Sequence, residues 1–289
     1  MTELNKIALK ILSNSKGILA ADESIGTMTK RLDSVNVAST SKNRLLFRET
    51  LLSSESMKDC IGGVILYDET INQLSSSNKT IPAMISEAGA LPGIKVDTGT
   101  KVLANSLEEK ITEGLDGLRE RLKKYYELGA RFTKWRGVYN ISEKYPSKLS
   151  VHSNAHALAR YSALVQESGM VPIIEPEVLM DGDHSAENCL NKTSEVIKKC
   201  FDEIMIHKVD LTGIILKPNM ILAGNKSKIK ISSDEVASKT LECLKNSVPS
   251  EIPGVAFLSG GQSEIEATEN LNLISRNNNT NFIITYSYG

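Results

Sequence analysis

The feature that most constrains the fold is an alternation of two kinds of segment along the whole chain. Short apolar runs rich in Ile and Val alternate with longer runs whose apolar residues recur at helical spacing. The short runs are predicted strands and cover residues 17–24, 61–69, 93–97, 130–136, 170–177, 213–219, 254–261 and 282–289. Strands that alternate with helices are typical of a parallel sheet. Eight of them in 289 residues favour an α/β fold of one (β/α)8 TIM barrel over an open doubly wound sheet.

The helical pattern is clearest in the segments 114–129, 153–169, 185–209 and 232–248. A shorter amphipathic stretch near the N-terminus carries its apolar stripe on Leu4, Ile7, Ala8 and Ile11. The sequence has no internal repeat and no long linker. We therefore predict a single barrel domain over residues 1–289.

The composition narrows the range of partners. The formal net charge is -1 and 40% of the residues are hydrophobic, as in an ordinary globular protein. We therefore expect neither nucleic acid nor a membrane surface as a partner. No apolar run approaches the ~20 residues that span a bilayer, and the N-terminus lacks a signal-peptide core. The four cysteines show no close pairing, so we expect free thiols in a reducing cytoplasm.

Charged residues gather where the predicted apolar strands end. Three strands carry charged pairs at positions i and i+2, which share one face of a strand: Lys95 and Asp97, Lys134 and Arg136, and Glu175 and Glu177. In a (β/α)8 barrel the carboxyl ends of the strands form the mouth that holds the active site. One such charge is often just the start of a loop. Three pairs of mixed sign predict a balanced polar network at the mouth.

Lys217 ends the apolar run 214–216 and is followed at once by Pro218. Lysine is almost never fully buried unless it is paired. One interpretation is a side chain whose stem lies on apolar surface while its amine reaches water. The other is a nucleophile, because a neutral lysine forms a Schiff base with a carbonyl and the iminium then permits a carbon–carbon bond to break. Glu175 and Asp22 are the candidates for moving the protons.

A second signal is Ser259-Gly260-Gly261, which follows a predicted strand and precedes a helix opening near Ser263. Glycines let backbone N–H groups approach an oxyanion, and a helix start favours negative charge. Many such barrels bind phosphate after strands seven and eight. An ordinary turn has the same composition, and Glu264 and Glu266 are equally the helix's own dipole partners.

Eight motifs occur along the chain in the order known from one enzyme family. They are KGILAADESIGTMTKRL (16–32), CIGGVILYDET (60–70), GIKVDTG (93–99), GLDGL (114–118), TKWR (133–136), VPIIEPEVLMDGDH (171–184), ILKPNM (215–220) and FLSGGQSEIEA (257–267). The chain resembles class I fructose-bisphosphate aldolase. The resemblance implies a cytoplasmic (β/α)8 barrel and homotetramer that needs no metal or other cofactor. It implies reversible cleavage of fructose 1,6-bisphosphate to dihydroxyacetone phosphate and glyceraldehyde 3-phosphate.

The resemblance also assigns roles to single residues. Lys217 resembles the Schiff-base lysine, and Glu175 the main proton shuttle, with Glu177 beside it. Asp22 resembles the base for the C4 hydroxyl, and Lys134 the ammonium that polarises the site. The residues that the resemblance places against the sugar phosphate are Ser24, Thr27, Lys30, Arg31, Lys95, Arg136, Ser259, Gly260, Gly261, Ser287 and Gly289.

The sequence departs from the family's pattern after Gly289, where members continue with an arginine, an eighth helix and a tail ending in tyrosine. We therefore expect a barrel incomplete at its C-terminus, with Ile283 and Tyr286 exposed and with low activity. A poorly active, truncated relative that serves as a binding protein is one alternative. Another is a different lysine-dependent barrel, such as a transaldolase or a deoxyribose-phosphate aldolase. Preference between fructose 1,6-bisphosphate and fructose 1-phosphate stays open.

A metal enzyme is a further alternative. His152 and His156 stand four apart on a predicted helix, which is a ligand spacing, but the residues between them lack the glutamate of a zinc-peptidase motif. An ordinary helix face is the simpler interpretation. The run DGDH (181–184) leads into a helix, so that capping explains its acidic residues. We predict no metal site.

Overall fold

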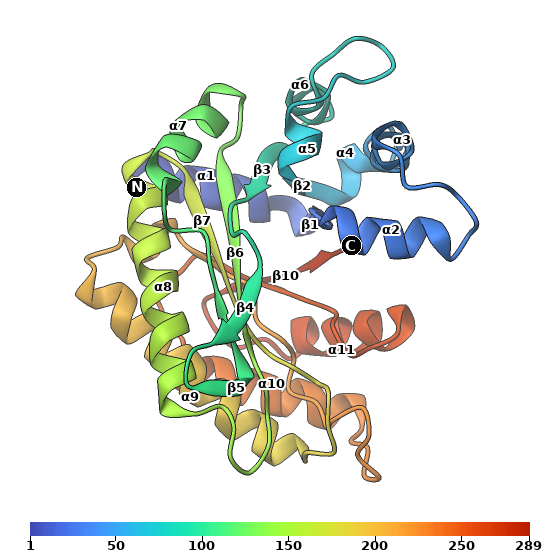
Figure 1. The fold of residues 1–289 in the computed structure, drawn as a ribbon. Helices are drawn as coiled ribbons and strands as arrows, with labels where there is room; N and C mark the ends of the chain where they lie inside the picture. The colour runs from blue at the N-terminus through green and yellow to red at the C-terminus, as the bar shows by residue number, and fades with distance from the viewer.

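Eight parallel strands close into one barrel, with neighbours in the order β1-β10-β9-β8-β7-β6-β3-β2 (Figure 1). The computed structural model describes residues 1–289, apart from the side chain of residue 107. The barrel strands are β1 (Gly17–Ala21), β2 (Ile61–Leu66), β3 (Leu91–Lys95), β6 (Phe132–Tyr139), β7 (Val171–Val178), β8 (Ile215–Leu216), β9 (Gly254–Phe257) and β10 (Ile283–Tyr288). Each of the eight predicted strands corresponds to one of these, so the (β/α)8 prediction is confirmed.

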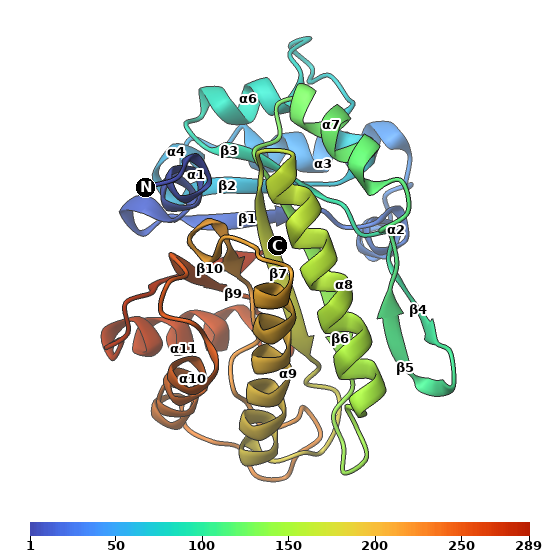
Figure 2. The ribbon, with the colours of Figure 1, turned by 90° about the vertical axis from the view of Figure 1, so that its left-hand side faces the viewer.

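Helices surround the barrel (Figures 1 and 2). They are α1 (Glu3–Leu12), α2 (Ile25–Asp33), α3 (Ser41–Leu52), α4 (Met57–Cys60), α5 (Asp68–Ile71), α6 (Ile81–Glu87), α7 (Leu118–Glu127), α8 (Lys148–Glu167), α9 (Ala186–Ile206), α10 (Ser233–Ser247) and α11 (Glu264–Arg276). Serine side chains cap α8, α9, α10 and α11 at Ser147, Ser185, Ser232 and Ser263. The acidic residues of DGDH are therefore not the cap of α9, because Ser185 fills that position.

Helix α1 packs against the starts of the strands and fills one end of the barrel. Ala8, Ile11 and Leu12 are fully or almost fully buried and share an apolar cluster with the barrel interior. Gly62 at the start of β2 permits this approach, because a Cβ there would collide with the main-chain oxygen of Ile11. The barrel interior is therefore apolar where the strands begin, and polar groups lie at the opposite end, where the strands finish.

The interior layers follow from the two-residue period of the strands. Phe132, Ile173 and Ile215 belong to the interior cluster next to α1. Two residues further along the same strands stand Lys134, Glu175 and Lys217. Side chains two apart share a face, so each strand carries its apolar residue inside first and its charged residue inside next.

A two-stranded antiparallel hairpin, β4 (Thr100–Leu103) and β5 (Ser106–Thr112), follows β3. The sequence did not predict it, because its strands are rich in charged residues and short of branched apolar ones. The one local signal is Asn105 in the turn, which has a φ of 65°. Thr112 Oγ1 donates to the Arg136 carbonyl at 2.6 Å, and Asn154 Nδ2 donates to the Lys110 carbonyl at 2.9 Å, which fixes the hairpin to β6 and α8.

Strand β10 corrects one expectation about exposure. Ile283 was expected at the surface, but it packs against the interior apolar cluster, because it shares a face with buried Thr285 and Ser287. Ile284, Tyr286 and Tyr288 have the opposite parity and are half-buried. Tyr286 donates to the Cys60 carbonyl at 2.9 Å.

None of the helices over the described residues is long and apolar enough to cross a membrane.

Candidate active site

A cavity of about 410 Å³ opens at the carboxyl ends of the strands. Its lining residues are Ala20, Asp22, Glu23, Ser24, Thr27, Arg31, Lys95, Asp97, Gly99, Thr100, Lys134, Arg136, Glu175, Glu177, Lys217, Leu258, Ser259, Gly260, Ser287 and Gly289. Residues from all three charged pairs therefore meet Lys217 in one cavity.

Four charged side chains form a continuous row across the cavity floor. Lys217 Nζ lies 3.0 Å from Glu175 Oε1, and Lys134 Nζ lies 3.1 Å from Glu175 Oε2. Lys134 Nζ also lies 2.6 Å from Asp22 Oδ2. All four residues are at most 8% exposed. The row Lys217–Glu175–Lys134–Asp22 explains why a buried strand ends on a lysine: the amine is paired with a buried carboxylate.

Neighbouring charges set the protonation states of the two central groups. Burial disfavours the ammonium form of Lys134, but Asp22 and Glu175 outweigh burial and hold the pKa of Lys134 above its ordinary value. Burial also disfavours the charged form of Glu175, but Lys134 and Lys217 outweigh it and lower the pKa of Glu175 to about 2. At neutral pH Glu175 is therefore a carboxylate and Lys134 an ammonium.

The two remaining charged pairs stand beside this row. Arg136 Nε donates to Glu177 Oε2 at 2.5 Å, and Glu177 is 7% exposed. Lys95 Nζ lies 2.5 Å from Asp97 Oδ1. Asp97 also accepts hydrogen bonds from the backbone N–H groups of Gly99 and Arg136. Asp97 therefore ties the end of β3 to β6 and holds Lys95 at the cavity wall.

Three polar atoms in the cavity wall are buried without a hydrogen-bond partner among the described residues. They are Glu23 Oε2, Glu175 Oε2 and Ser287 Oγ. Glu175 Oε2 is within ion-pair distance of Lys134, but the geometry is not that of a hydrogen bond. Buried polar atoms are nearly always satisfied in folded proteins. These three atoms are therefore free to contact a polar group in the cavity.

The predicted phosphate residues divide between the cavity and its surroundings. Ser259 and Gly260 line one side, and Ser24, Thr27 and Arg31 line another. Lys30 and Gly261 are not among the lining residues. Lys30 is exposed on α2. Gly261 adopts a φ of 81° in the turn before α11, so it shapes the loop.

The sequence missed several contributors to the cavity. Glu23 forms an ion pair with Arg31 at 2.7 Å, and Gly99 and Thr100 come from the loop and hairpin after β3. Arg48 of α3 is fully buried behind β1 and donates to the carbonyls of Ala21 and Glu23, on either side of Asp22. No sequence pattern predicts this role of Arg48, because the sequence does not show that this arginine of α3 is buried.

A (β/α)8 barrel with a buried lysine paired to carboxylates at its mouth defines a class of protein, the barrel lyases that act through a lysine. Comparison with known proteins identifies the family. The chain matches the family model of fructose-bisphosphate aldolase class-I over residues 3–289 and belongs to that family. It is a lyase that reversibly cleaves fructose 1,6-bisphosphate through a lysine Schiff base, as the sequence predicted.

Individual relatives agree with this assignment. The chain is 47% identical over 288 residues to cytosolic fructose-bisphosphate aldolase 4 of Arabidopsis thaliana, covering 99% of this chain and 73% of the relative. It is 47% identical over 289 residues to fructose-bisphosphate aldolase C of Rattus norvegicus, covering 99% and 80%. The solved fructose-bisphosphate aldolase of Plasmodium falciparum, in complex with TRAP and a small-molecule inhibitor, superposes with a TM-score of 0.97 at 42% identity, covering 99% and 83%. The alternative of a non-catalytic binding protein is not favoured.

Proposed function

We propose that Lys217 forms the Schiff base and that Glu175 is the main proton shuttle. The observation that carries this proposal is the position of Glu175 between two lysine amines. Lys134 contacts two carboxylates, which stabilise its ammonium form, whereas Lys217 contacts only one. Lys134 therefore supplies fixed positive charge, and Lys217 supplies the nucleophile.

The proposed steps use the row in order. Glu175, a carboxylate, first takes a proton from the Lys217 ammonium. The free amine attacks the substrate ketone carbon, and a proton passes from the nitrogen to the ketone oxygen. The resulting carbinolamine loses water as Glu175 delivers its proton to the leaving hydroxyl, which leaves the iminium. Asp22 takes the proton of the C4 hydroxyl, the C3–C4 bond breaks, and its electron pair moves into the iminium to give an enamine. The aldehyde product leaves. Protonation of the enamine and hydrolysis of the iminium release the ketone product and restore Lys217.

The ends of the cavity suit the two phosphates of the substrate. We assign Ser259, Gly260 and Ser287 to one phosphate and Ser24, Thr27 and Arg31 to the other, with Gly289 and Lys95 completing the wall. Arg31 is paired with Glu23, so binding a phosphate there requires Arg31 to exchange one anion for another. Arg136 is held by Glu177, and we propose that it contacts the substrate from that position. Lys30 and Gly261 act indirectly, through charge and loop shape.

We also propose that the protein works in the cytoplasm as a homotetramer. The free thiols of Cys60, Cys189, Cys200 and Cys243 suit a reducing compartment, and two relatives are cytosolic aldolases. The tetramer rests on the resemblance to the family. Size-exclusion chromatography with light scattering tests it, and a monomer at micromolar concentration would contradict it.

Borohydride trapping tests the assignment of Lys217. Reduction in the presence of dihydroxyacetone phosphate should leave a covalent adduct on Lys217, located by peptide mass mapping. Lys134→Arg keeps the positive charge and should still allow the adduct to form, whereas Lys217→Arg should abolish it. An adduct on Lys134 or Lys95 would contradict the assignment.

A further inference from the structure

Helices α8 and α9 lie side by side on the outside of the barrel (Figure 2). Three of the chain's four histidines lie close together on these two helices. The side chains of His152 and His156 on α8 are 61% and 45% exposed. His207 caps the end of α9 and lies 5.1 Å from His156 between ring centroids. Glu203 of α9 stands among them and is only 5% exposed. This cluster has no part in the proposed reaction.

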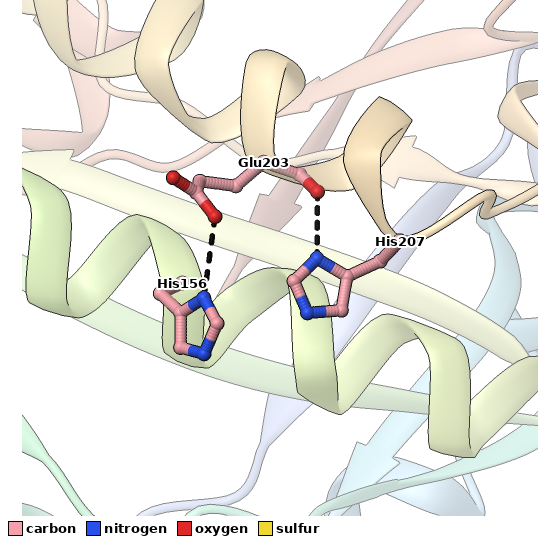
Figure 3. Close-up of side chains that lie close together, drawn as sticks. All are labelled: His156, Glu203 and His207. Carbon is pink, nitrogen blue, oxygen red and sulfur yellow. Dashed lines mark hydrogen bonds and ion pairs between the residues drawn. The ribbon is translucent and has the colours of Figure 1, made fainter.

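Glu203 orients two of the rings (Figure 3). His156 Nδ1 lies 3.2 Å from Glu203 Oε2, and His207 Nδ1 lies 2.8 Å from the main-chain oxygen of Glu203. Carboxylate and carbonyl oxygens only accept, so each Nδ1 carries a proton and donates it. In a neutral imidazole the proton on Nδ1 leaves the lone pair on Nε2. In Figure 3 the second nitrogen of each ring lies on the side away from Glu203.

We propose that His156 and His207 bind a divalent transition-metal ion of the zinc type through Nε2, with Glu203 holding the two rings from behind. Potential ligand atoms of His156, Glu203 and His207 lie within 4.8 Å of one another. No other group of three potential ligands with this spacing occurs among the described residues. Zinc bonds of about 2 Å place ligand atoms roughly 3–3.5 Å apart. The exposed His156 ring can rotate about its side-chain torsions and so bring its ligand atom closer to the others, to the spacing that zinc requires.

The chemistry of the set favours zinc, copper or nickel over magnesium or calcium. Imidazole nitrogen is a ligand of the former metals, whereas the latter prefer oxygen. A buried carboxylate that hydrogen-bonds a ligand histidine is the usual way to fix its ring orientation. Here Glu203 already does so before any metal binds. A metal at this position would join α8 to α9.

Two neighbours modulate the site. Lys199 Nζ lies 2.7 Å from Glu203 Oε1, so its positive charge opposes a metal ion there. His152 Nδ1 lies 3.5 Å from the same oxygen and is close enough to add a ligand after rotation. Removing the charge of Lys199 should therefore strengthen metal binding. Binding elsewhere on the surface would not respond to Lys199.

Isothermal titration calorimetry with ZnCl2 on the full chain tests the proposal. We expect one zinc ion per chain, and affinity lower by about 10-fold or more in His156→Gln, His207→Gln and Glu203→Gln. Glu195→Gln, on the same helix and outside the cluster, is the matched control and should bind as the wild type. Lys199→Gln should bind zinc more tightly. Zinc should also raise the melting temperature of the wild type but not of His156→Gln.

The outcomes separate a site from chance binding. Equal zinc affinity in the wild type and both histidine variants would overturn the proposal, as would the absence of any zinc-dependent heat. His156 is exposed, so its substitution should leave the fold intact, which circular dichroism checks. The result does not depend on the reaction at the mouth, because aldol cleavage is not the readout.

Discussion

Lys134 Nζ lies 2.6 Å from Asp22 Oδ2, and this contact joins strands β6 and β1, which do not pair with each other in the barrel. Strands β2 and β3 lie between them. The ion pair therefore crosses the mouth and depends on closure of the barrel. With Glu175 on the other side of Lys134, it fixes the relative positions of three strands around the place where a substrate would bind.

Replacing Lys134 tests how strongly the row stabilises the fold. Lys134→Met leaves Asp22 and Glu175 buried without their shared cation, and breaking a buried pair in this way costs about 3–5 kcal/mol. The free energy of unfolding from urea denaturation should fall by that amount. Lys192→Gln removes an exposed pair with Glu195 and should cost less than about 1 kcal/mol. Similar losses in the two variants would contradict a stabilising role for the row.

Replacing Glu175 tests proton transfer. Glu175→Gln keeps the size of the side chain but removes its basic carboxylate, so kcat should fall by ~10²–10⁴-fold, the usual contribution of a general acid–base group. The KM for fructose 1,6-bisphosphate should change far less. Single-turnover kinetics should place the defect in the steps around the carbinolamine and the iminium. Near-normal turnover would mean that Glu175 is only a structural partner of the two lysines.

The depressed pKa of Glu175 predicts how stability depends on pH. Its pKa is about 2 in the folded protein against an ordinary value of 4.5, so the unfolded chain binds the proton more readily. The stabilisation that the Glu175 carboxylate contributes is complete above about pH 4.5 and is lost as the pH falls toward about 2. Urea denaturation from neutral pH down to about pH 3 should show a shallower loss in Glu175→Gln than in the wild type. If the stability of the two proteins fell equally with pH, Glu175 would not be the cause of the acid sensitivity.

Arg48 is predicted to position Asp22 from behind. Its guanidinium donates to the Ala21 carbonyl at 3.1 Å and to the Glu23 carbonyl at 2.7 Å, a span that a lysine ammonium cannot reproduce. Arg48→Lys should lower kcat more than it raises KM, because Asp22, the proposed base for the C4 hydroxyl, moves. Arg44→Lys is the control, since Arg44 binds Glu69 and not the backbone around Asp22. Equal effects of the two substitutions on kcat would indicate a general loss of stability.

Chelation should leave the cleavage rate unchanged. Side chains fill every role in the proposed reaction, so prolonged dialysis against EDTA should not alter kcat for fructose 1,6-bisphosphate. If zinc binds at His156 and His207, the same dialysis should lower the melting temperature without affecting turnover. Loss of activity that zinc restores would contradict the Schiff-base assignment.

Much of the site was predictable because strand geometry is local. The two-residue period places Glu175 and Glu177 on one face of β7, and Lys134 and Arg136 on one face of β6, whatever the rest of the chain does. The hairpin β4–β5 was not predictable in this way. Its stability comes from bonds to β6 and α8 rather than from an apolar strand pattern.

The amino-acid sequence was enough to predict the number of barrel strands, their order along the chain and the charges that each of them carries to the mouth. It was enough because side-chain periodicity and turn chemistry act over a few residues. Which of these charges meet depends on the folded arrangement of the strands and helices. The register of β7 and β8 pairs Lys217 with Glu175, and the curvature of the barrel brings Lys134 to Asp22. Lys30 lies outside the cavity, and the packing of α8 on α9 brings Glu203 and His207 to His156. These contacts join residues far apart in the chain, and their distances depend on strand register and helix packing, which no local pattern encodes.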